Sequence, residues 1–248
     1  IQSQIQMDRL QKAEHEVDIH VVKTNKPIDM DPEGTMWNEV PASEVHLMPL
    51  SARSSPINRI TIQSLMNDEE MGIRLEWNDE TPDRSSSRHQ DFKDAVAVEF
   101  ALGDVTLHAH GHNEPFFGMG NRGKVVNIWQ WRADWQQEIA IKKKLERATQ
   151  DMDLDVMIFG GEANPVDSLN PFREIPVEEL NAEGFGTLTP QPLTKQNVNG
   201  NGIWKDGKWR VVFKRVVKST NKWDVDFADG KMPILIAFAV WDGTQSDR

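Results

Sequence analysis

Cysteine and tyrosine are both absent from this sequence of 248 residues. Without a thiol, the chain cannot form a disulfide, attach a haem covalently, ligate iron through a thiolate or hold an iron–sulfur cluster by itself. Without tyrosine, no phenolate is available to iron. Any haem iron bound by this chain would therefore take its axial ligands from Met, His or Lys side chains.

Basic residues and long apolar runs are also scarce. The 28 Lys and Arg residues are outnumbered by 39 Asp and Glu residues, which gives a formal net charge of -11. This charge repels phosphate backbones and argues against nucleic acid as a partner. The longest apolar run, 233–241, is far short of the roughly 20 residues of a transmembrane helix, so we expect a soluble protein. The first residue, Ile1, is consistent with a chain from which a targeting segment has been removed.

Apolar and polar residues alternate in several short runs, which is the pattern of half-buried β-strands. The clearest runs are 60–65, 73–77 and 95–100. Asp206-Gly207 and Asp229-Gly230 have the composition of tight hairpin turns. The sequence therefore predicts an all-β protein, built as an antiparallel β-sandwich. Further candidate strands are 18–22, 45–48, 125–131, 155–159, 209–217 and 233–241.

We predict that residues 17–248 form a single sandwich domain, because a hydrophobic content of 38% suits one soluble domain of this length. The polar stretch 1–16 is expected to form an N-terminal arm. Residues 133–152 contain no Gly or Pro and predict an inserted helix, with Asp134 as its candidate N-cap. Residues 160–192 are rich in Pro and predict long loops, which in a compact domain commonly bind a ligand or act as a lid.

Met119 is the first candidate for chemistry. Its thioether is a soft sulfur that can ligate haem iron, and the flanking Gly118 and Gly120 keep the backbone slim enough for a large flat ligand. The alternative is a flexible core residue, which is the commoner role of Met. Aromatic residues nearby fit a ligand pocket, although at strand spacing they are usually core: Phe116, Phe117, Trp129 and Trp131.

Lys195 is the second candidate, in the loop-like stretch 192–198. A lysine amine ligates iron only when it is neutral, and an ordinary pKa of about 10.4 opposes this unless burial and the metal together favour deprotonation. The alternative is a solvated loop lysine. Local sequence alone favours that alternative.

Three histidines, His108, His110 and His112, alternate along the chain. In a strand they would share one face and could chelate Zn, Cu or Ni. Because His is also a common haem ligand, His110 or His112 could replace Met119 or lie beside a haem edge. The alternative is a surface strand end with solvated imidazoles. The sequence contains no nucleophile elbow, phosphate-binding loop or paired catalytic signature, so it predicts no active site for bond-making chemistry.

Six segments, taken in order, resemble the haem b subunit of the type II molybdopterin oxidoreductases, the ethylbenzene dehydrogenase gamma-subunit family. The resemblance covers most of the chain, and each segment is weak alone. The stretch Pro115-Phe116-Phe117-Gly118-Met119-Gly120-Asn121, which leads into 126–131, is the most distinctive. The other segments are 31–37, 74–83, 94–100, 195–213 and 236–243.

The resemblance implies one noncovalent b-type haem whose axial ligands, by matching position, are Met119 and Lys195. We expect Phe117, Gly118 and Trp129 to contribute to the same haem pocket. The family also implies an electron-transfer subunit in a periplasmic heterotrimer with a molybdopterin catalytic subunit and an iron–sulfur subunit, with a soluble cytochrome as external redox partner. The three histidines are not part of the family pattern.

Two other functions fit the residues alone. Nine tryptophans could form a stacking platform, as in a carbohydrate-binding β-sandwich. The strand of alternating histidines could instead belong to a metal-binding periplasmic protein.

Overall fold

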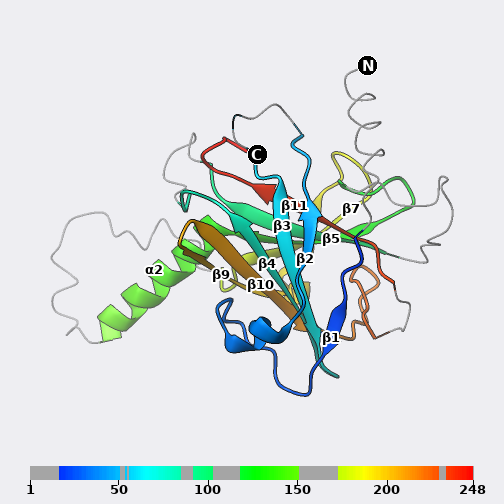
Figure 1. Cartoon of the computed structure of the whole chain (residues 1–248), viewed down its shortest axis with the longest axis horizontal. Coiled ribbons are helices and arrows are strands. Elements are labelled where there is room, and N and C mark those ends of the chain that lie inside the picture. The colour runs from blue at the N-terminus through cyan, green and yellow to red at the C-terminus, as the bar shows by residue number, and fades with distance from the viewer. Residues whose placement is uncertain are drawn as a thin grey trace.

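The protein is a sandwich of two β-sheets, and the helix α2 lies at its edge (Figure 1). This arrangement in the computed structural model confirms the predicted all-β sandwich with an inserted helix. The structure describes residues 17–50, 54, 56–84, 92–102, 118–150, 173–228 and 233–247.

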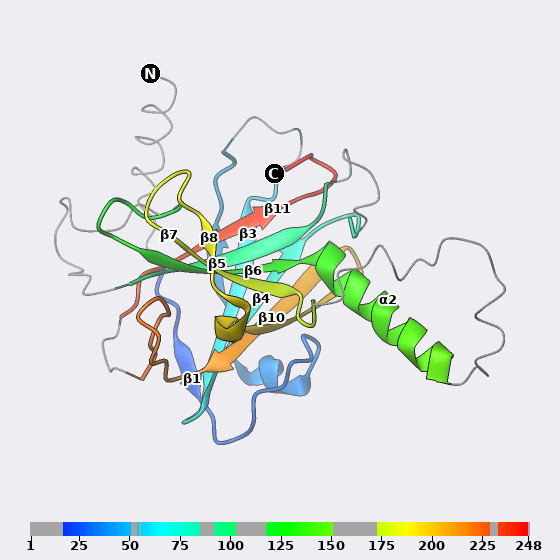
Figure 2. The same ribbon diagram turned by 180° about the vertical axis from the view of Figure 1, so that it is seen from behind.

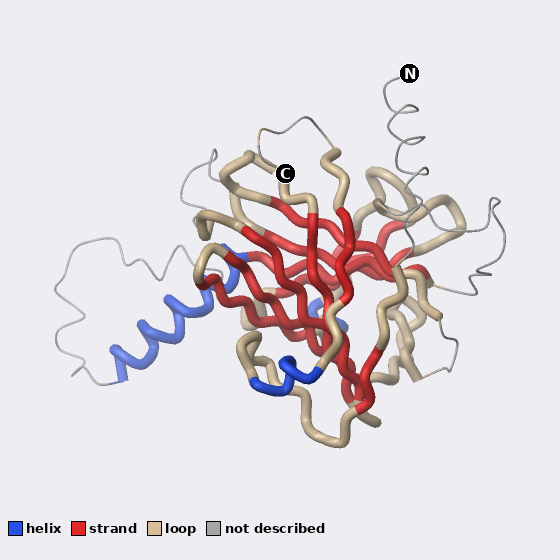
Figure 3. The backbone as a smooth tube through the Cα atoms, in the orientation of Figure 1, coloured by secondary structure: helices blue, strands red, loops and turns tan. Residues whose placement is uncertain are grey.

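The first sheet has six strands, in the order β1-β3-β4-β10-β9, with β2 also paired to β3 (Figure 1). Figure 3 shows the strands as the red segments of the backbone. All its pairs are antiparallel except β1 with β3, which is parallel. Asp206 and Gly207 form the β9–β10 turn with φ values of 54° and 71°, as their composition predicts. The strands are β1 (Val21–Lys23), β2 (Ser43–His46), β3 (Arg59–Met66), β4 (Glu70–Asn78), β9 (Asn199–Lys205) and β10 (Lys208–Val216).

The second sheet has five strands, in the order β11-β5-β6-β7-β8, and every pair is antiparallel (Figure 2). The strands β5, β6 and β11 overlap predicted strands, whereas β8 is only two residues long. The strands are β5 (Ala95–Ala101), β6 (Val126–Arg132), β7 (Val177–Ala182), β8 (Thr189–Pro190) and β11 (Ile236–Trp241).

Large aromatic side chains fill the space between the sheets. Trp131 from the second sheet meets Trp209 from the first with ring centroids 5.0 Å apart, and Phe100 lies 4.6 Å from Trp129. Aromatic pairs at such spacings add to the stabilisation from burial. Five of the nine tryptophans are at most 2% exposed and cannot form a surface stacking platform: Trp37, Trp77, Trp129, Trp131 and Trp209.

Two glycines of β9 make room for this packing. A Cβ on Gly202 would lie 2.3 Å from Trp131 Cζ2, and a Cβ on Gly200 would lie 2.3 Å from Val177 Cγ2. Both glycines therefore permit the two sheets to approach each other. The strand β9 was not among the predicted strands, because its two glycines and two asparagines depress strand propensity.

The helix α2 (Ala133–Gln150) follows β6 directly and extends away from the sandwich (Figure 1). It begins at Ala133, so Asp134 lies in its first turn and is not the N-cap. The Asp134 carboxylate instead accepts hydrogen bonds from Arg132 Nε and Nη2, at 3.2 and 3.1 Å. Gln136 ties the helix to β9 by bonding both the N–H and the C=O of Gly202. No helix of the described residues is long and apolar enough to cross a membrane.

The strand β7 lies inside the region 160–192, which was predicted to be loop, and that prediction is wrong for residues 177–182. The sequence did not predict β7 because Glu179, a charged residue, occupies an inward position where a half-buried strand normally has an apolar residue. Three further predictions fall outside the described residues: the arm 1–16, the strand 155–159 and the Asp229-Gly230 turn.

The outer face of the first sheet is covered by the chain itself. Residues 27–40 cross it, including the short 3₁₀ helix η1 (Thr35–Glu39). Ile28, Trp37 and Val40 pack there against two strand residues, Leu65 and Val212. This face is therefore closed by an apolar cluster of its own.

We predict that Gly202→Ala destabilises the protein by roughly 1–3 kcal/mol, because the added methyl group forces the Trp131 ring out of its packed position. Chemical denaturation followed by tryptophan fluorescence measures this change. Asn199→Ala is the matched control, since Asn199 lies exposed on the same strand. Its cost should stay within about 0.5 kcal/mol. Equal stability of the two variants would contradict the packing described here.

Candidate functional site

The outer face of the second sheet carries small and aliphatic side chains. Strand alternation places Ala97, Glu99 and Ala101 on this face of β5, opposite the inward Val98 and Phe100. Figure 2 views the molecule from this side. A separate apolar cluster forms here, made of Ala97, Val126, Ile128, Leu180 and Ala182, with Met119 and Trp241 packed against it. The Met119 side chain thus belongs to the outer face and not to the core between the sheets.

The backbone that presents Met119 is unusual. Gly118, Met119 and Gly120 have φ values of 133°, 153° and 70°. Met119 therefore adopts a conformation that residues with a Cβ rarely take, at a cost on the order of 1–3 kcal/mol. A Cβ on Gly120 would lie 2.5 Å from the Lys124 carbonyl oxygen, so only glycine fits there. Strain of this kind is characteristic of functional sites.

Glu99 lies beside this loop. It is 8% exposed, and one carboxylate oxygen accepts a hydrogen bond of 3.2 Å from the Gly118 N–H. Burial raises the pKa of Glu99 to about 7, against the opposing effect of that hydrogen bond. Glu99 was not among the predicted site residues. Its only signal in the sequence is a single charge in the apolar run 95–101.

Lys195 ends the short 3₁₀ helix η4 (Leu193–Lys195), which follows β8, and its side chain is exposed. The amine makes no hydrogen bond or ion pair with any described residue. The next residue, Gln196, fixes the segment to β7. Its side chain accepts from the Glu179 N–H at 2.6 Å and donates to the Glu179 C=O at 3.0 Å, as a neighbouring strand would.

A buried ionic network holds the other side of this segment. Arg215 Nη1 lies 3.4 Å from Glu179 Oε1 and 4.0 Å from Asp224 Oδ2. The side chains of all three residues are 0% exposed to solvent. Burial raises the pKa of Glu179, aided by Asp224 and opposed by Arg215, and it lowers the pKa of Arg215. The Asn197 N–H donates to Glu179 Oε2 at 3.3 Å. The backbone on the C-terminal side of Lys195 is therefore anchored in the protein interior.

The strand β7 brings the two predicted ligands into one region. The Met119 C=O accepts a hydrogen bond of 2.7 Å from the Gly184 N–H, just beyond the end of β7. The segment of Lys195 is bonded to Glu179, on the same strand. The backbone between Glu179 and Gly184 spans at most roughly 18 Å. Met119 and Lys195 are thus both tethered to one short stretch of chain.

The remaining predicted site residues do not all lie beside Met119. Gly118 lies with Met119 on the outer face. Trp129 is fully buried between the sheets, where its indole N–H donates to Asn127 Oδ1 at 3.1 Å, so it lies on the opposite side of the second sheet from Met119. Phe117 and the three histidines, His108, His110 and His112, lie outside the described residues.

Three known proteins are similar to this sequence over 88% of its length. The protein named "Putative respiratory nitrate reductase heme subunit ORF7", from Haloferax mediterranei, is 29% identical, and the chain spans 62% of it. The chlorate reductase subunit gamma of Ideonella dechloratans is 23% identical, with 72% of its length covered. The dimethylsulfide dehydrogenase subunit gamma of Rhodovulum sulfidophilum is 25% identical, with 69% covered.

Among solved structures, a family 9 carbohydrate binding module from Caldicellulosiruptor kristjanssonii in complex with glucose aligns with a TM-score of 0.39 and 11% identity. The alignment covers 93% of this chain and 82% of that one. Values this low carry no conclusion about the ligand of the present protein.

The family model described as ethylbenzene dehydrogenase matches residues 34–248. This range contains the strained Met119 loop, the segment of Lys195 and every strand of both sheets except β1. It also contains five of the six sequence segments on which the resemblance rests and most of the sixth, 31–37. The chain therefore belongs to the ethylbenzene dehydrogenase family.

Proposed function

We propose that this protein is an electron-transfer subunit that holds one noncovalent b-type haem at the outer face of the second sheet, with Met119 and Lys195 as axial ligands. The observation that carries the proposal is the position of Met119, whose strained loop presents a thioether against an apolar face instead of burying it in the core. A heme subunit and two gamma subunits of oxidoreductases among the relatives support it.

The residues of this face suit a haem. Its small and aliphatic side chains, among them Ala97 and Ala182, are at most 8% exposed and would provide the apolar lining that a porphyrin requires. The donor set is a thioether from Met119 and an amine from Lys195, and the Lys195 amine is not engaged by any described residue. Because the sequence has no cysteine, the haem would be held without covalent bonds. When bound with both axial positions filled, it supplies one-electron transfer and cannot bind a substrate.

The surrounding residues would support the ligands. Gly118 lines the site and holds Glu99 through its N–H. Trp129, a residue of β6, packs in the core and so supports the second sheet from its inner side. Phe117 precedes the loop and is proposed to contact the haem. Glu179 and Gln196 would position the Lys195 segment.

The subunit would relay electrons between a catalytic complex and a soluble redox protein. We propose a molybdopterin catalytic subunit and an iron–sulfur subunit as partners in a heterotrimer, and the periplasm as the compartment. The relatives named as subunits of chlorate reductase and dimethylsulfide dehydrogenase support such an assembly. A formal net charge of -11 would favour a basic cytochrome as the external partner.

The first test is spectroscopic. The protein purified after expression with haem supplied should show a six-coordinate, low-spin haem spectrum. Acidified organic solvent should extract the pigment completely, because no thiol can bind it covalently. A colourless protein, or a pigment that resists extraction, would reject the proposal.

The second test assigns the ligands. Met119→Ala should open one axial position and give a high-spin haem that binds added imidazole, and Lys195→Ala should do the same at the other position. Absorption and electron paramagnetic resonance spectra report both changes. Met48→Ala and Lys218→Ala are matched controls at exposed positions and should keep the low-spin spectrum.

The same spectra separate Met119 from the histidines. His110→Ala and His112→Ala should leave the low-spin spectrum unchanged. A histidine substitution that abolishes it, together with a Met119→Ala variant that preserves it, would show that the ligand assignment is wrong.

The third test concerns Glu99, whose pKa is raised to about 7 by burial. Reduction removes one positive charge from the proposed site, so Glu99 should bind its proton more tightly in the reduced protein. The midpoint potential should then fall as the pH rises through neutrality, by at most about 59 mV per pH unit for one electron and one proton. Potentiometric titration from pH 6 to 8 measures this slope.

Glu99→Gln keeps the acceptor for the Gly118 N–H but cannot titrate, so it should flatten the slope. Glu39→Gln, at an exposed position on η1, should not. A slope that survives Glu99→Gln would remove Glu99 from the site.

A further inference from the structure

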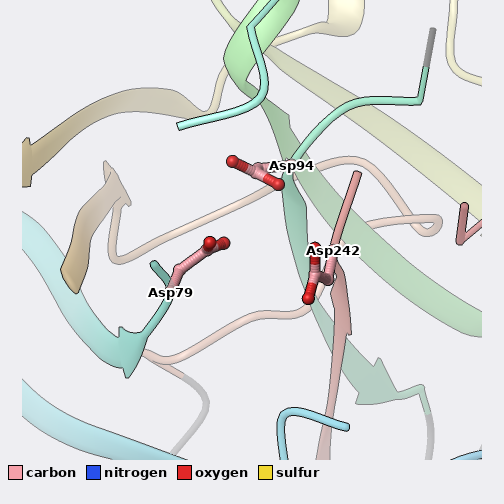
Figure 4. A group of neighbouring side chains, drawn as sticks. All are labelled: Asp79, Asp94 and Asp242. Atoms are coloured by element: carbon pink, nitrogen blue, oxygen red, sulfur yellow. The ribbon is translucent and has the colours of Figure 1, made fainter. Parts of the chain in front are cut away.

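Three carboxylates from distant parts of the sequence meet at one end of the sandwich (Figure 4). Asp79 follows β4, Asp94 precedes β5 and Asp242 follows β11. One carboxylate oxygen from each lies within 4.8 Å of those of the other two. Three of the segments that carry the family resemblance, 74–83, 94–100 and 236–243, contribute one aspartate each.

The packing around the three aspartates is close. Gly243 donates its N–H to Asp94 Oδ1 at 3.0 Å, and a Cβ on Gly243 would lie 2.5 Å from both Asp83 Cβ and the Phe92 carbonyl oxygen. Asp94 Oδ2 accepts from Trp209 Nε1 at 2.8 Å and from the Asp83 N–H at 2.7 Å. The aspartates are therefore held in place by the backbone and by a core tryptophan, and not by one another.

One carboxylate oxygen of Asp79 is buried without a hydrogen-bond donor in the part of the chain that the structure describes. The residue is 6% exposed, and its Oδ1 accepts from the Thr81 N–H at 3.1 Å. Its Oδ2 is buried without any hydrogen-bond donor among the described residues. Figure 4 shows the Asp79 carboxylate directed toward Asp94 and Asp242. A buried carboxylate oxygen with no donor is costly, so this atom points to a ligand that the protein chain does not supply.

The negative charge at this place is also unneutralised. No Lys or Arg of the described residues forms an ion pair with Asp79, Asp94 or Asp242. The charge of these three carboxylates is therefore not balanced by a basic side chain of the described residues, and a bound cation would balance it.

We propose that Asp79, Asp94 and Asp242 form a binding site for a Ca²⁺ ion. Carboxylate oxygens are the ligands that this hard cation prefers, at roughly 2.3–2.6 Å. Three ligand oxygens that all lie within 4.8 Å of one another can reach a single Ca²⁺ ion at such distances, whereas Mg²⁺ demands a near-ideal octahedron at about 2.1 Å and gives up its water reluctantly. The remaining ligands would be water or backbone carbonyl oxygens.

The role of the ion is structural. It joins the end of β4, the start of β5 and the turn after β11, which are far apart in the sequence. None of the three aspartates belongs to the Met119 loop or to the segment of Lys195, so the site does not depend on the proposed haem.

The test uses the full-length protein, freed of divalent ions with a chelator. At pH 7, addition of Ca²⁺ to a hundredfold excess over its Kd should raise the Tm by roughly 5–10 °C, while Mg²⁺ should have a much smaller effect. Tb³⁺ should replace Ca²⁺ and emit on excitation of tryptophan, because Trp209 is hydrogen-bonded to Asp94. Added Ca²⁺ should remove this emission.

Asp79→Asn should abolish both responses and raise the Tm of the ion-free protein, because it removes a buried charge without changing the shape of the side chain. Glu80→Gln, at the exposed neighbouring position, should retain both responses. The proposal is overturned if Ca²⁺ neither raises the Tm nor displaces Tb³⁺, or if the Asp79→Asn protein responds as the unaltered protein does. Should the variant fail to fold, the Tb³⁺ emission of the unaltered protein and its loss on Ca²⁺ addition still decide the matter.

Discussion

The ion pair between Arg215 and Glu179 joins the two sheets inside the sandwich, since Arg215 belongs to β10 and Glu179 to β7. Moving two charges from water into a protein interior costs several kcal/mol for each ion unless pairing and hydrogen bonds compensate. Here the guanidinium also bonds the Val225 carbonyl, and the carboxylate accepts from Asn127 and Asn197. These contacts fix the position of β7. The loops of Met119 and Lys195 are both bonded to β7 or its end, so the candidate site depends on this buried pair.

The two outer faces of the sandwich differ in how they are used. The chain covers the first with residues 27–40, where Trp37 packs against Leu65 and Val212. The second carries alanines and other aliphatic side chains, and Met119 packs on it from a loop whose backbone is strained. The face that we assign to the haem is thus built mainly from alanine and aliphatic side chains, with Trp241 packed against them, whereas most of the buried tryptophans lie in the core.

Much of the sandwich could be predicted from alternation, because β3, β4, β5, β6, β10 and β11 follow a local pattern of apolar and polar residues. The strands β7 and β9 could not. The inward position of Glu179 is explained by Arg215, 36 residues away, and the glycines of β9 are explained by the Trp131 ring across the sheets. Met119 was found by resemblance, whereas Glu99 and the three aspartates were not, because their neighbours come from several strands and leave no spacing in the sequence.

The strand β8 has a consequence for assembly. It forms one edge of the second sheet, is two residues long and contains Pro190, which has no N–H to donate. An edge of this kind gives an incoming strand almost no backbone to pair with. Another polypeptide therefore cannot extend the sheet on the side where Lys195 is anchored. A neighbouring subunit on that side must contact loops and side chains, so the proposed electron path there would cross side chains and not follow a continuous β-ladder.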